Sequence, residues 1–257
     1  MPSPDKPSPA RRNQPEQQAP PVQRLRIHYA KRGRLRFTSH RDFSRAFERA
    51  VFRARIPMAY SSGFNPHPRI SYMGAAPMGS ASEAEYVEIA LAEVIDPARA
   101  HADIDEALPE GLDVIEVVVS AGDSLADRLE GSLWRITLVD APLRETREAV
   151  ETLLATEEVI VERMTKKGMR SFDARAAMVS VVVAEQTSGE LPCAILDVVL
   201  RHGSPSVRPD DVLAALRETS GLRVTAALQQ RLAQGPLGLE GGTVGDPLTP
   251  DRDAAGQ

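Results

Sequence analysis

The sequence has little cysteine, few aromatic residues and no long apolar run. A single cysteine, Cys193, among 257 residues excludes an internal disulfide and every metal centre built from several thiolates. No apolar stretch approaches the roughly 20 residues that span a bilayer. Residues 1–21 are rich in proline and glutamine and lack the apolar core of a secretory signal. We therefore predict a cytoplasmic protein with no membrane partner.

Motifs that mark common enzyme classes are also missing. The chain contains no P-loop, no G-x-G-x-x-G turn and no nucleophile elbow. Metal ligation would have to come from scattered side chains, because no two histidines stand one helical turn apart. Those side chains are His40, His67, Glu83 and Glu85. The sequence therefore predicts neither a cofactor nor a metal site.

The charge of the chain is unevenly distributed along its length. The formal net charge is −5, yet residues 24–69 contain eleven arginines and one lysine against only Asp42 and Glu48, a net of +10. Residues 1–23 contribute +1, so the remainder carries −16. A basic segment inside an acidic protein points to an anionic partner. The alternative is a solvated surface that acidic neighbours neutralise in the fold.

Turn and helix signals divide the chain into two similar halves. Residues 1–22 hold seven prolines, and residues 235–257 are rich in glycine, proline and aspartate, so both ends are predicted to be disordered tails. Residues 23–121 follow a strand–helix–strand–strand–helix–strand order, which is the ferredoxin-like pattern. Residues 131–232 repeat this order coarsely, with one strand to spare. The predicted fold class is α+β, with tandem ferredoxin-like lobes that each place helices on one face of an antiparallel sheet.

The first predicted strand alternates strictly between apolar and polar positions. Leu25, Ile27 and Tyr29 would face the helices, whereas Arg26 and His28 would face the opposite side. Open sheet faces of this kind bind ligands in other proteins. We therefore expect Arg26 to be accessible to a ligand.

The helix predicted after this strand combines an apolar stripe with a basic face. The stripe consists of Phe43, Ala46, Phe47, Ala50, Val51 and Ala54. Arg41, Arg45 and Arg49 recur every four residues on the opposite side, and Phe52 falls within the same arc. Guanidinium groups at this spacing can bind successive phosphates, and an exposed aromatic ring can stack on a base. This pattern favours contact with nucleic acid.

The loop of residues 61–69 has an unusual composition. Gly63 permits a positive φ, and Pro66 and Pro68 stiffen the backbone around His67. A stiff loop loses little entropy on binding and can present side chains to a ligand, although a purely structural crossover would explain the same residues. The predicted binding residues are Arg26, Arg36, His40, Arg41, Arg45, Arg49, Asn65, His67 and Arg69.

Five segments carry a family resemblance. They are residues 36–42 (RFTSHRD), 60–70 (YSSGFNPHPRI), 77–83 (PMGSASE), 172–175 (FDAR) and 206–210 (SVRPD). Through them the chain resembles the radical-SAM-linked family, an uncharacterised domain found beside or fused to cobalamin-binding radical SAM proteins. Met78 departs slightly from the family pattern, which has leucine. The resemblance implies a radical SAM protein as partner and supplies no catalytic residues; with one cysteine instead of the three that hold the cluster, the chain would be an accessory protein.

Two functions follow from these residues. The first is an accessory protein that binds RNA or another anionic substrate for a radical SAM partner through the arginine-rich surface. The alternative is an RNA-acting enzyme, a metal-independent endoribonuclease or an RNA-modifying enzyme, in which His28, His40, His67 or Asp42 supply the acid and base. A helix-capping role explains Asp42 without chemistry. A protein scaffold also stays open, because the acidic remainder could attract a basic partner.

Overall fold

The computed structural model describes residues 17–165, 168–185, 194–238 and 242–256. Its strands are β1 (Gln23–Lys31), β2 (Ile70–Met73), β3 (Ala81–Leu91), β4 (Leu112–Val119), β5 (Gly131–Val139), β6 (Ile160–Thr165), β7 (Gly168–Asp173), β8 (Met178–Glu185), β9 (Ala194–Arg201) and β10 (Ala226–Gly235). Its helices are α1 (His40–Arg53), α2 (Pro97–Ala107), α3 (Leu125–Arg128), α4 (Leu143–Ala155), α5 (Pro209–Ser220) and α6 (Thr249–Ala255), with 3-10 turns at Gly33–Phe37 and Arg175–Ala177. Residues 1–16 of the predicted N-terminal tail, and Cys193, lie outside the described residues.

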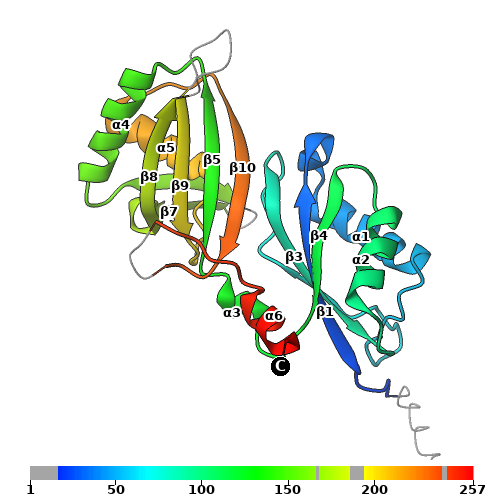
Figure 1. The fold of residues 1–257 in the computed structure, drawn as a ribbon. Helices are drawn as coiled ribbons and strands as arrows, with labels where there is room; N and C mark the ends of the chain where they lie inside the picture. The colour runs from blue at the N-terminus through cyan, green and yellow to red at the C-terminus, as the bar shows by residue number, and fades with distance from the viewer. Residues whose placement is uncertain (1–16, 166–167, 186–193, 239–241, 257) are drawn as a thin grey trace, which may run out of the picture.

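Eight strands form one mixed sheet that runs through the molecule (Figure 1). The order is β4-β1-β3-β10-β5-β9-β8, and β2 pairs with β3. The N-terminal lobe comprises β1 to β4 with α1 and α2, and the C-terminal lobe comprises β5 to β10 with α4 and α5. The lobes meet where β3 and β10 pair in parallel, Ala81 with Gln230 and Ser82 with Arg231, and we call this junction the seam. The α+β class is as predicted, but the two sheets are continuous.

The two lobes share one strand order. It is β4-β1-β3-β2 in the N-terminal lobe and β10-β5-β9-β8 in the C-terminal lobe, and every pairing within a lobe is antiparallel. The strand to spare in the sequence is accounted for by β6 and β7, which form a separate hairpin between α4 and β8. Within the described ranges, no helix is both long and apolar enough to cross a membrane.

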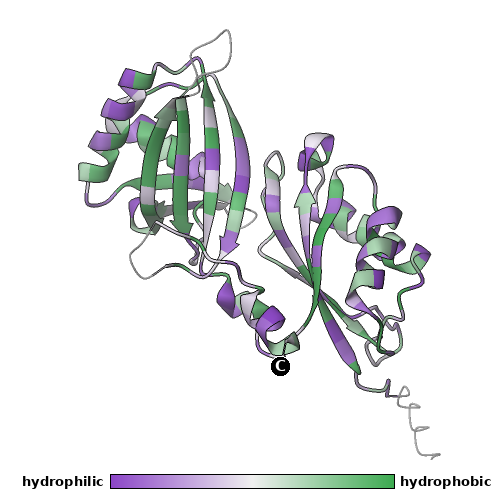
Figure 2. Ribbon diagram, in the orientation of Figure 1, coloured by the Kyte–Doolittle hydropathy of each residue, from purple (hydrophilic) through white to green (hydrophobic). Residues whose placement is uncertain are grey.

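Each lobe has its own apolar core between its helices and its sheet. In the N-terminal lobe, Leu25 and Ile27 of β1 are fully buried and belong to one cluster with Phe43 and Phe47 of α1. In the C-terminal lobe, the corresponding cluster joins β5, β8 and β9 to α4 and to Leu216 of α5. Hydrophobic and hydrophilic residues accordingly alternate along the strands (Figure 2). The periodicity of β1 therefore predicted which of its side chains face the helices.

Helix α1 begins at a capped end and buries the stripe that the sequence predicts. The Ser39 hydroxyl accepts a hydrogen bond from the backbone nitrogen of Asp42 (3.2 Å) and donates one to its carboxylate (2.6 Å). Of the predicted stripe, Phe43, Phe47, Ala50 and Val51 are buried, and Ala46 and Ala54 are half-buried. Because one face of α1 is committed to the core, its arginines point away from the sheet.

The predicted open face of the N-terminal sheet is covered, which corrects the expectation for Arg26. That side chain has no exposed surface. Its Nε donates to Glu88 at 3.0 Å, and its Nη1 donates to Asp251 of α6 at 2.7 Å. Arg26 therefore holds the C-terminal helix on the sheet and is not available to a ligand.

The predicted C-terminal tail is also corrected. The C-terminal lobe does not end at residue 232, because β10 runs from Ala226 to Gly235, and α6 follows with Asp251 fully buried. The apolar pattern of the sequence does not reveal the second half of β10, because its polar residues Arg231 and Gln234 are buried at the seam rather than exposed. The order of α6 comes from tertiary ion pairs, which its glycine- and proline-rich flanks do not reveal.

Candidate functional site

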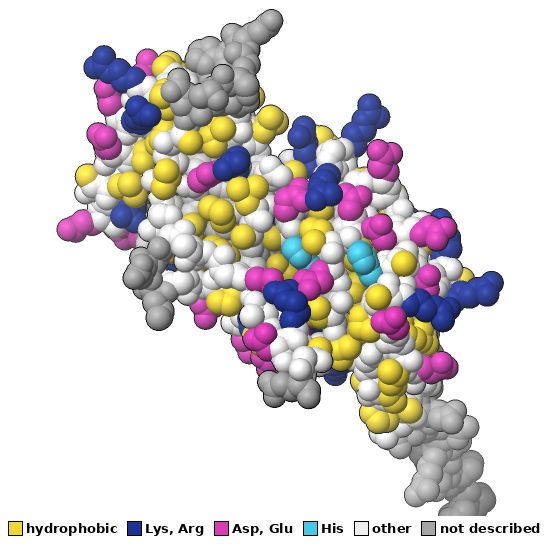
Figure 3. Space-filling view, in the orientation of Figure 1, with side chains coloured by type: hydrophobic (Ala, Val, Ile, Leu, Met, Phe, Trp, Pro, Cys, Tyr) yellow, Lys and Arg dark blue, Asp and Glu magenta, His cyan; other side chains and the backbone are white. Residues whose placement is uncertain are grey.

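The basic segment of the chain divides into a neutralised part and an unneutralised part. On β1 and the turn after it, ion pairs neutralise three arginines: Arg24 and Arg26 with Glu88, Arg26 with Asp251, and Arg32 with Glu83 and Asp113. Acidic and basic side chains are accordingly intermixed over β3 and β4 in Figure 3. For β1, the alternative that acidic neighbours neutralise the basic residues in the fold is thus correct.

The arginines of α1 are different. Arg41, Arg45 and Arg49 are exposed, and no ion pair forms on any of them among the residues that the structure describes. Arg55, just after the helix, is exposed and equally without an ion pair in that part of the chain. Phe52 stands among them with 81% of its surface exposed. We call these five residues the α1 surface; its positive charge is free to meet an anionic ligand.

Two hollows adjoin Phe52. A groove of about 740 Å³ is lined by Glu48, Val51, Phe52, Arg53, Arg55, Ile56, Pro57, Met58, Tyr60 and Pro68. A shallower hollow on the other side is lined by Arg45, Glu48, Arg49 and Phe52. The exposed ring thus separates two concavities that are both rimmed by arginine. The predicted binding residues did not include Phe52, Tyr60 or Arg55. The helical spacing did place Phe52 in the same arc as the arginines.

The loop before β2 folds back on itself beside this groove. Tyr60 and Pro68 form an isolated bridge, the backbone nitrogen of Ser61 donates to the His67 carbonyl at 2.9 Å, and the Arg69 Nε donates to the Tyr60 carbonyl at 3.1 Å. Asn65 and His67 are exposed, but the two hollows beside Phe52 do not include them. The loop therefore contributes Tyr60 and Pro68 to the groove, rather than the three side chains that the sequence suggested.

Arg36 stands apart from the α1 surface. It is half-buried, its guanidinium carbon lies 4.8 Å from the centroid of the Phe37 ring, and its Nε is buried without a hydrogen-bond partner in the described structure. Its carbonyl accepts a hydrogen bond from the backbone nitrogen of Gly79 at 2.8 Å. Arg36 thus links the turn before α1 to the loop before β3.

Two of the histidines proposed as acid and base lie on different sides of the sheet. His28 stacks on Tyr86 with ring centroids 4.8 Å apart, and its Nε2 lies 2.6 Å from the Glu83 carbonyl. Burial lowers the pKa of His28. His40, at the start of α1, packs edge-on against Tyr72 at 5.3 Å. Since β1 separates them, these two imidazoles cannot act together on one phosphodiester. No group of potential metal ligands occurs in the described ranges either.

The seam contains a buried polar cluster that the sequence did not predict. Arg231 of β10 and Glu85 of β3 form an ion pair and are 3% and 2% exposed in their side chains. Lys31 donates to the Ala76 carbonyl at 3.2 Å, and burial lowers its pKa although Glu85 raises it. Arg231, Glu85 and Lys31 each have a partner among the described residues, so the cluster joins the lobes and offers none of these three groups to a ligand.

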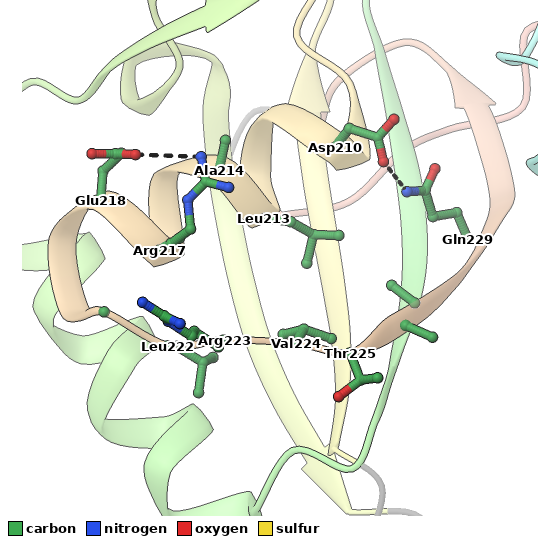
Figure 4. Close-up of a pocket in the computed structure, with 13 residues that line it drawn as sticks. Asp210, Leu213, Ala214, Arg217, Glu218, Leu222, Arg223, Val224, Thr225 and Gln229 are labelled. Carbon is green, nitrogen blue, oxygen red and sulfur yellow. Dashed lines mark hydrogen bonds and ion pairs between the residues drawn. The ribbon is translucent and has the colours of Figure 1, made fainter.

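A larger cavity than the two hollows beside Phe52 lies in the C-terminal lobe. It holds about 880 Å³ between α5 and the segment that leads into β10 (Figure 4). Four of its polar side chains are already paired, because Gln229 donates to Asp210 and Arg217 pairs with Glu218. Arg223 also lines it, but the cavity gathers no basic or nucleophilic cluster comparable to the α1 surface. The α1 surface is therefore the candidate site.

Comparisons with known proteins place the chain in a family. No curated protein matches it. The solved structures that align at low similarity include an unknown protein from Galdieria sulphuraria (13% identity, 81% of this chain and 98% of that chain, TM-score 0.24). They also include an encapsulated DyP-type peroxidase from Mycobacterium smegmatis (11% identity, 86% and 94%, TM-score 0.21). TM-scores this low establish no common fold. A family model matches residues 24–209, and the chain belongs to that family, described as "uncharacterized protein conserved in bacteria (DUF2344)".

Proposed function

We propose that the protein binds RNA through the α1 surface and acts as an accessory protein rather than as the enzyme that modifies the RNA. The observation that supports this most is the row of Arg41, Arg45 and Arg49, which have no ion pairs in the described structure, with the exposed ring of Phe52 among them. Unpaired guanidinium groups at one-turn spacing suit successive phosphates, and the ring suits a base. The resemblance found in the sequence makes a radical SAM protein the proposed partner.

The topology of the two lobes is consistent with an RNA-binding protein. We regard each lobe as a ferredoxin-like unit, because each repeats the strand order 4-1-3-2 with two helices. Such units bind RNA in several proteins, but through the open sheet face. Here that face is covered in the N-terminal lobe by α6, so the proposed RNA contact moves to the helical side.

The test is RNA binding across a range of salt concentrations. Replacing Arg41, Arg45 and Arg49 together by glutamine should weaken binding and flatten the plot of log affinity against log salt by about 0.7 per lost phosphate contact on a single strand. The matched control replaces Arg144, Arg147 and Arg217 of α4 and α5, which removes the same charge from the other lobe. The melting temperature of the α1 variant should stay nearly constant, since these side chains oppose the buried stripe.

Three results would decide against this function. No affinity for single-stranded RNA, structured RNA or DNA at low salt would leave a protein scaffold as the better explanation. Equal loss in the control variant would mean that total charge, rather than the α1 surface, governs binding. Cleavage of RNA in the same mixtures, abolished by His40→Ala or His67→Ala, would support the nuclease alternative.

A further inference from the structure

The end of α1 carries a backbone feature that charge alone does not explain. The backbone nitrogen of Arg55 donates to the Phe52 carbonyl, and that of Ile56 donates to the Val51 carbonyl, each at 3.0 Å. This pair of bonds is the Schellman motif, and Val51 and Ile56 also make its usual apolar contact, since both are buried in one cluster. The position that the motif normally gives to glycine is occupied by Arg55, with φ of +53°.

Arginine at this position costs stability. A side chain in the left-handed region brings its Cβ close to the backbone, so glycine is favoured there and a bulky residue is disfavoured. The motif closes without help from the guanidinium, because Arg55 is exposed and has no ion pair among the described residues. What the arginine adds is a positive charge on the rim of the groove beside Phe52. Strained non-glycine residues cluster at binding sites, so the place of Arg55 beside the groove suggests a role in binding.

The side chains that line the groove have the chemistry to bind a flat ring flanked by negative charge. Phe52 and Tyr60 are 81% and 41% exposed and offer aromatic faces, and Pro68 lines the groove with them. Arg55 lies on the rim, while Arg45 and Arg49 share the hollow on the other side of Phe52. Glu48 lines both hollows and can accept a hydrogen bond from an amino group of a base.

We propose that the groove beside Phe52 binds one unpaired nucleotide of a single-stranded RNA. The base stacks on Phe52, Arg55 contacts the phosphate on one side of it, and Arg45 and Arg49 contact the phosphates on the other. This inference rests on the proposed function and makes it narrower. Bases inside a duplex are stacked on each other and cannot reach a side-chain ring, so the ligand must expose unpaired bases.

The probe is a labelled oligoadenylate of about 12 nucleotides, alone or annealed to oligouridylate, with oligodeoxyadenylate as a further arm. Phe52→Leu, which keeps the apolar bulk and removes the ring, should weaken binding of the single strand about tenfold, whereas Phe52→Trp should retain it. Neither change should alter the salt dependence. The DNA arm shows whether the groove requires the ribose 2′-hydroxyl.

Substitution of Arg55 separates binding from folding. Arg55→Gly should raise the melting temperature by about 2 °C, because glycine relieves the left-handed backbone, and should at the same time weaken single-strand binding severalfold. Asp140 is the matched control, since it has φ of +61° in the other lobe. Asp140→Gly should also stabilise the protein but leave RNA affinity unchanged. Arg55→Lys, which keeps the positive charge, should retain most of the RNA affinity of the native protein.

The outcomes distinguish this inference from the proposed function. Equal affinity for the duplex and the single strand, or no effect of Phe52→Leu and Arg55→Gly while the triple arginine variant loses binding, would overturn the base groove and leave RNA binding by α1 intact. No binding of any probe by the native protein would overturn both. Weaker binding by Asp140→Gly to the same degree as by Arg55→Gly would assign the effect to the backbone and also reject the groove.

Discussion

The two lobes place an arginine–carboxylate pair at the same point of the same topology. Arg26 of β1 stands opposite Glu88 of β3, and Arg135 of β5 stands opposite Asp197 of β9. In the N-terminal lobe the two side chains are 0% and 11% exposed, whereas in the C-terminal lobe they are 44% and 27% exposed. The difference is the cover: α6 brings Asp251 onto Arg26. The Arg26–Glu88 pair therefore helps to hold a helix on the sheet, whereas the equivalent Arg135–Asp197 pair lies near solvent.

The first helices of the lobes differ in the same way. Helix α1 carries a net charge of +2 and α4 a net charge of −1. Arg144 of α4 is paired with Glu148 at 2.9 Å, and the helix has no aromatic residue, whereas α1 has unpaired arginines in the described structure and an exposed Phe52. Shared topology thus does not imply shared function, and the function has to be argued from the side chains.

The largest expected effect concerns the seam that joins the lobes. Arg231→Met should lower the free energy of unfolding by about 4 kcal/mol, because it leaves the Glu85 carboxylate buried without its ion-pair partner. Urea unfolding can be followed by far-UV circular dichroism and by the fluorescence of Trp134, the one tryptophan, whose ring lies 5.5 Å from the Arg231 guanidinium. If the seam makes the lobes unfold together, the two signals should coincide in the native protein and separate in the variant. An unchanged midpoint would show that the lobes are stable independently.

The next effect compares the covered pair with the uncovered one. Asp251→Asn should cost about 3 kcal/mol, since Asp251 is fully buried and accepts from both Arg26 and Arg128. Asp197→Asn, which breaks the partly exposed pair with Arg135, should cost about 0.5 kcal/mol. Urea midpoints of the two variants measure the difference. Equal losses would mean that the cover by α6 contributes little to the N-terminal lobe.

Much of the fold could be predicted because local patterns agree with it. Most strands and helices of both halves follow from apolar periodicity. Ser39 before α1 and Gly221 after α5, with φ of +73°, are residue types that commonly flank helices. Strand β10 and α6 could not be found in this way. Their polar residues are buried by partners far away in the sequence, as Arg231 is by Glu85 and Asp251 by Arg26, and no local pattern encodes such pairs.

The candidate site was predictable in part for the same reason. Helical spacing is a local property, so the row of arginines opposite the apolar stripe was visible in the sequence. The same charge count also included Arg26 and Arg32, and only tertiary pairing shows that these are neutralised. The contribution of Arg55 depends on a left-handed backbone at a helix end, and that of Tyr60 depends on how the loop closes. The spacing of residues in the sequence indicates neither contribution.

The smallest expected effect is a pH dependence that differs between the lobes. Burial lowers the pKa of His28 in the N-terminal lobe and of His202 in the C-terminal lobe below the usual 6.5. The unfolded imidazoles then bind protons at a pH where the folded ones do not, so stability is complete above about pH 7 and declines as the pH falls below 6.5. A hydrogen bond to a backbone carbonyl offsets part of the pKa shift of each imidazole, that of Glu83 for His28 and that of Leu129 for His202. The carboxylates of Asp246, Glu116 and Glu83 offset the shift of His28 further, whereas Arg231 adds to that of His202.

His202→Gln should therefore flatten the decline in unfolding free energy between about pH 7.5 and 5.5 more than His28→Gln does. Glutamine can still hydrogen-bond but cannot take up the proton, so each variant removes the titration of one lobe. Urea unfolding at several pH values measures the slopes, and the double variant should have the flattest one. A native slope that neither variant changes would assign the decline to other groups. A larger effect of His28→Gln would show that its carboxylate neighbours are too well screened to oppose the burial of the imidazole.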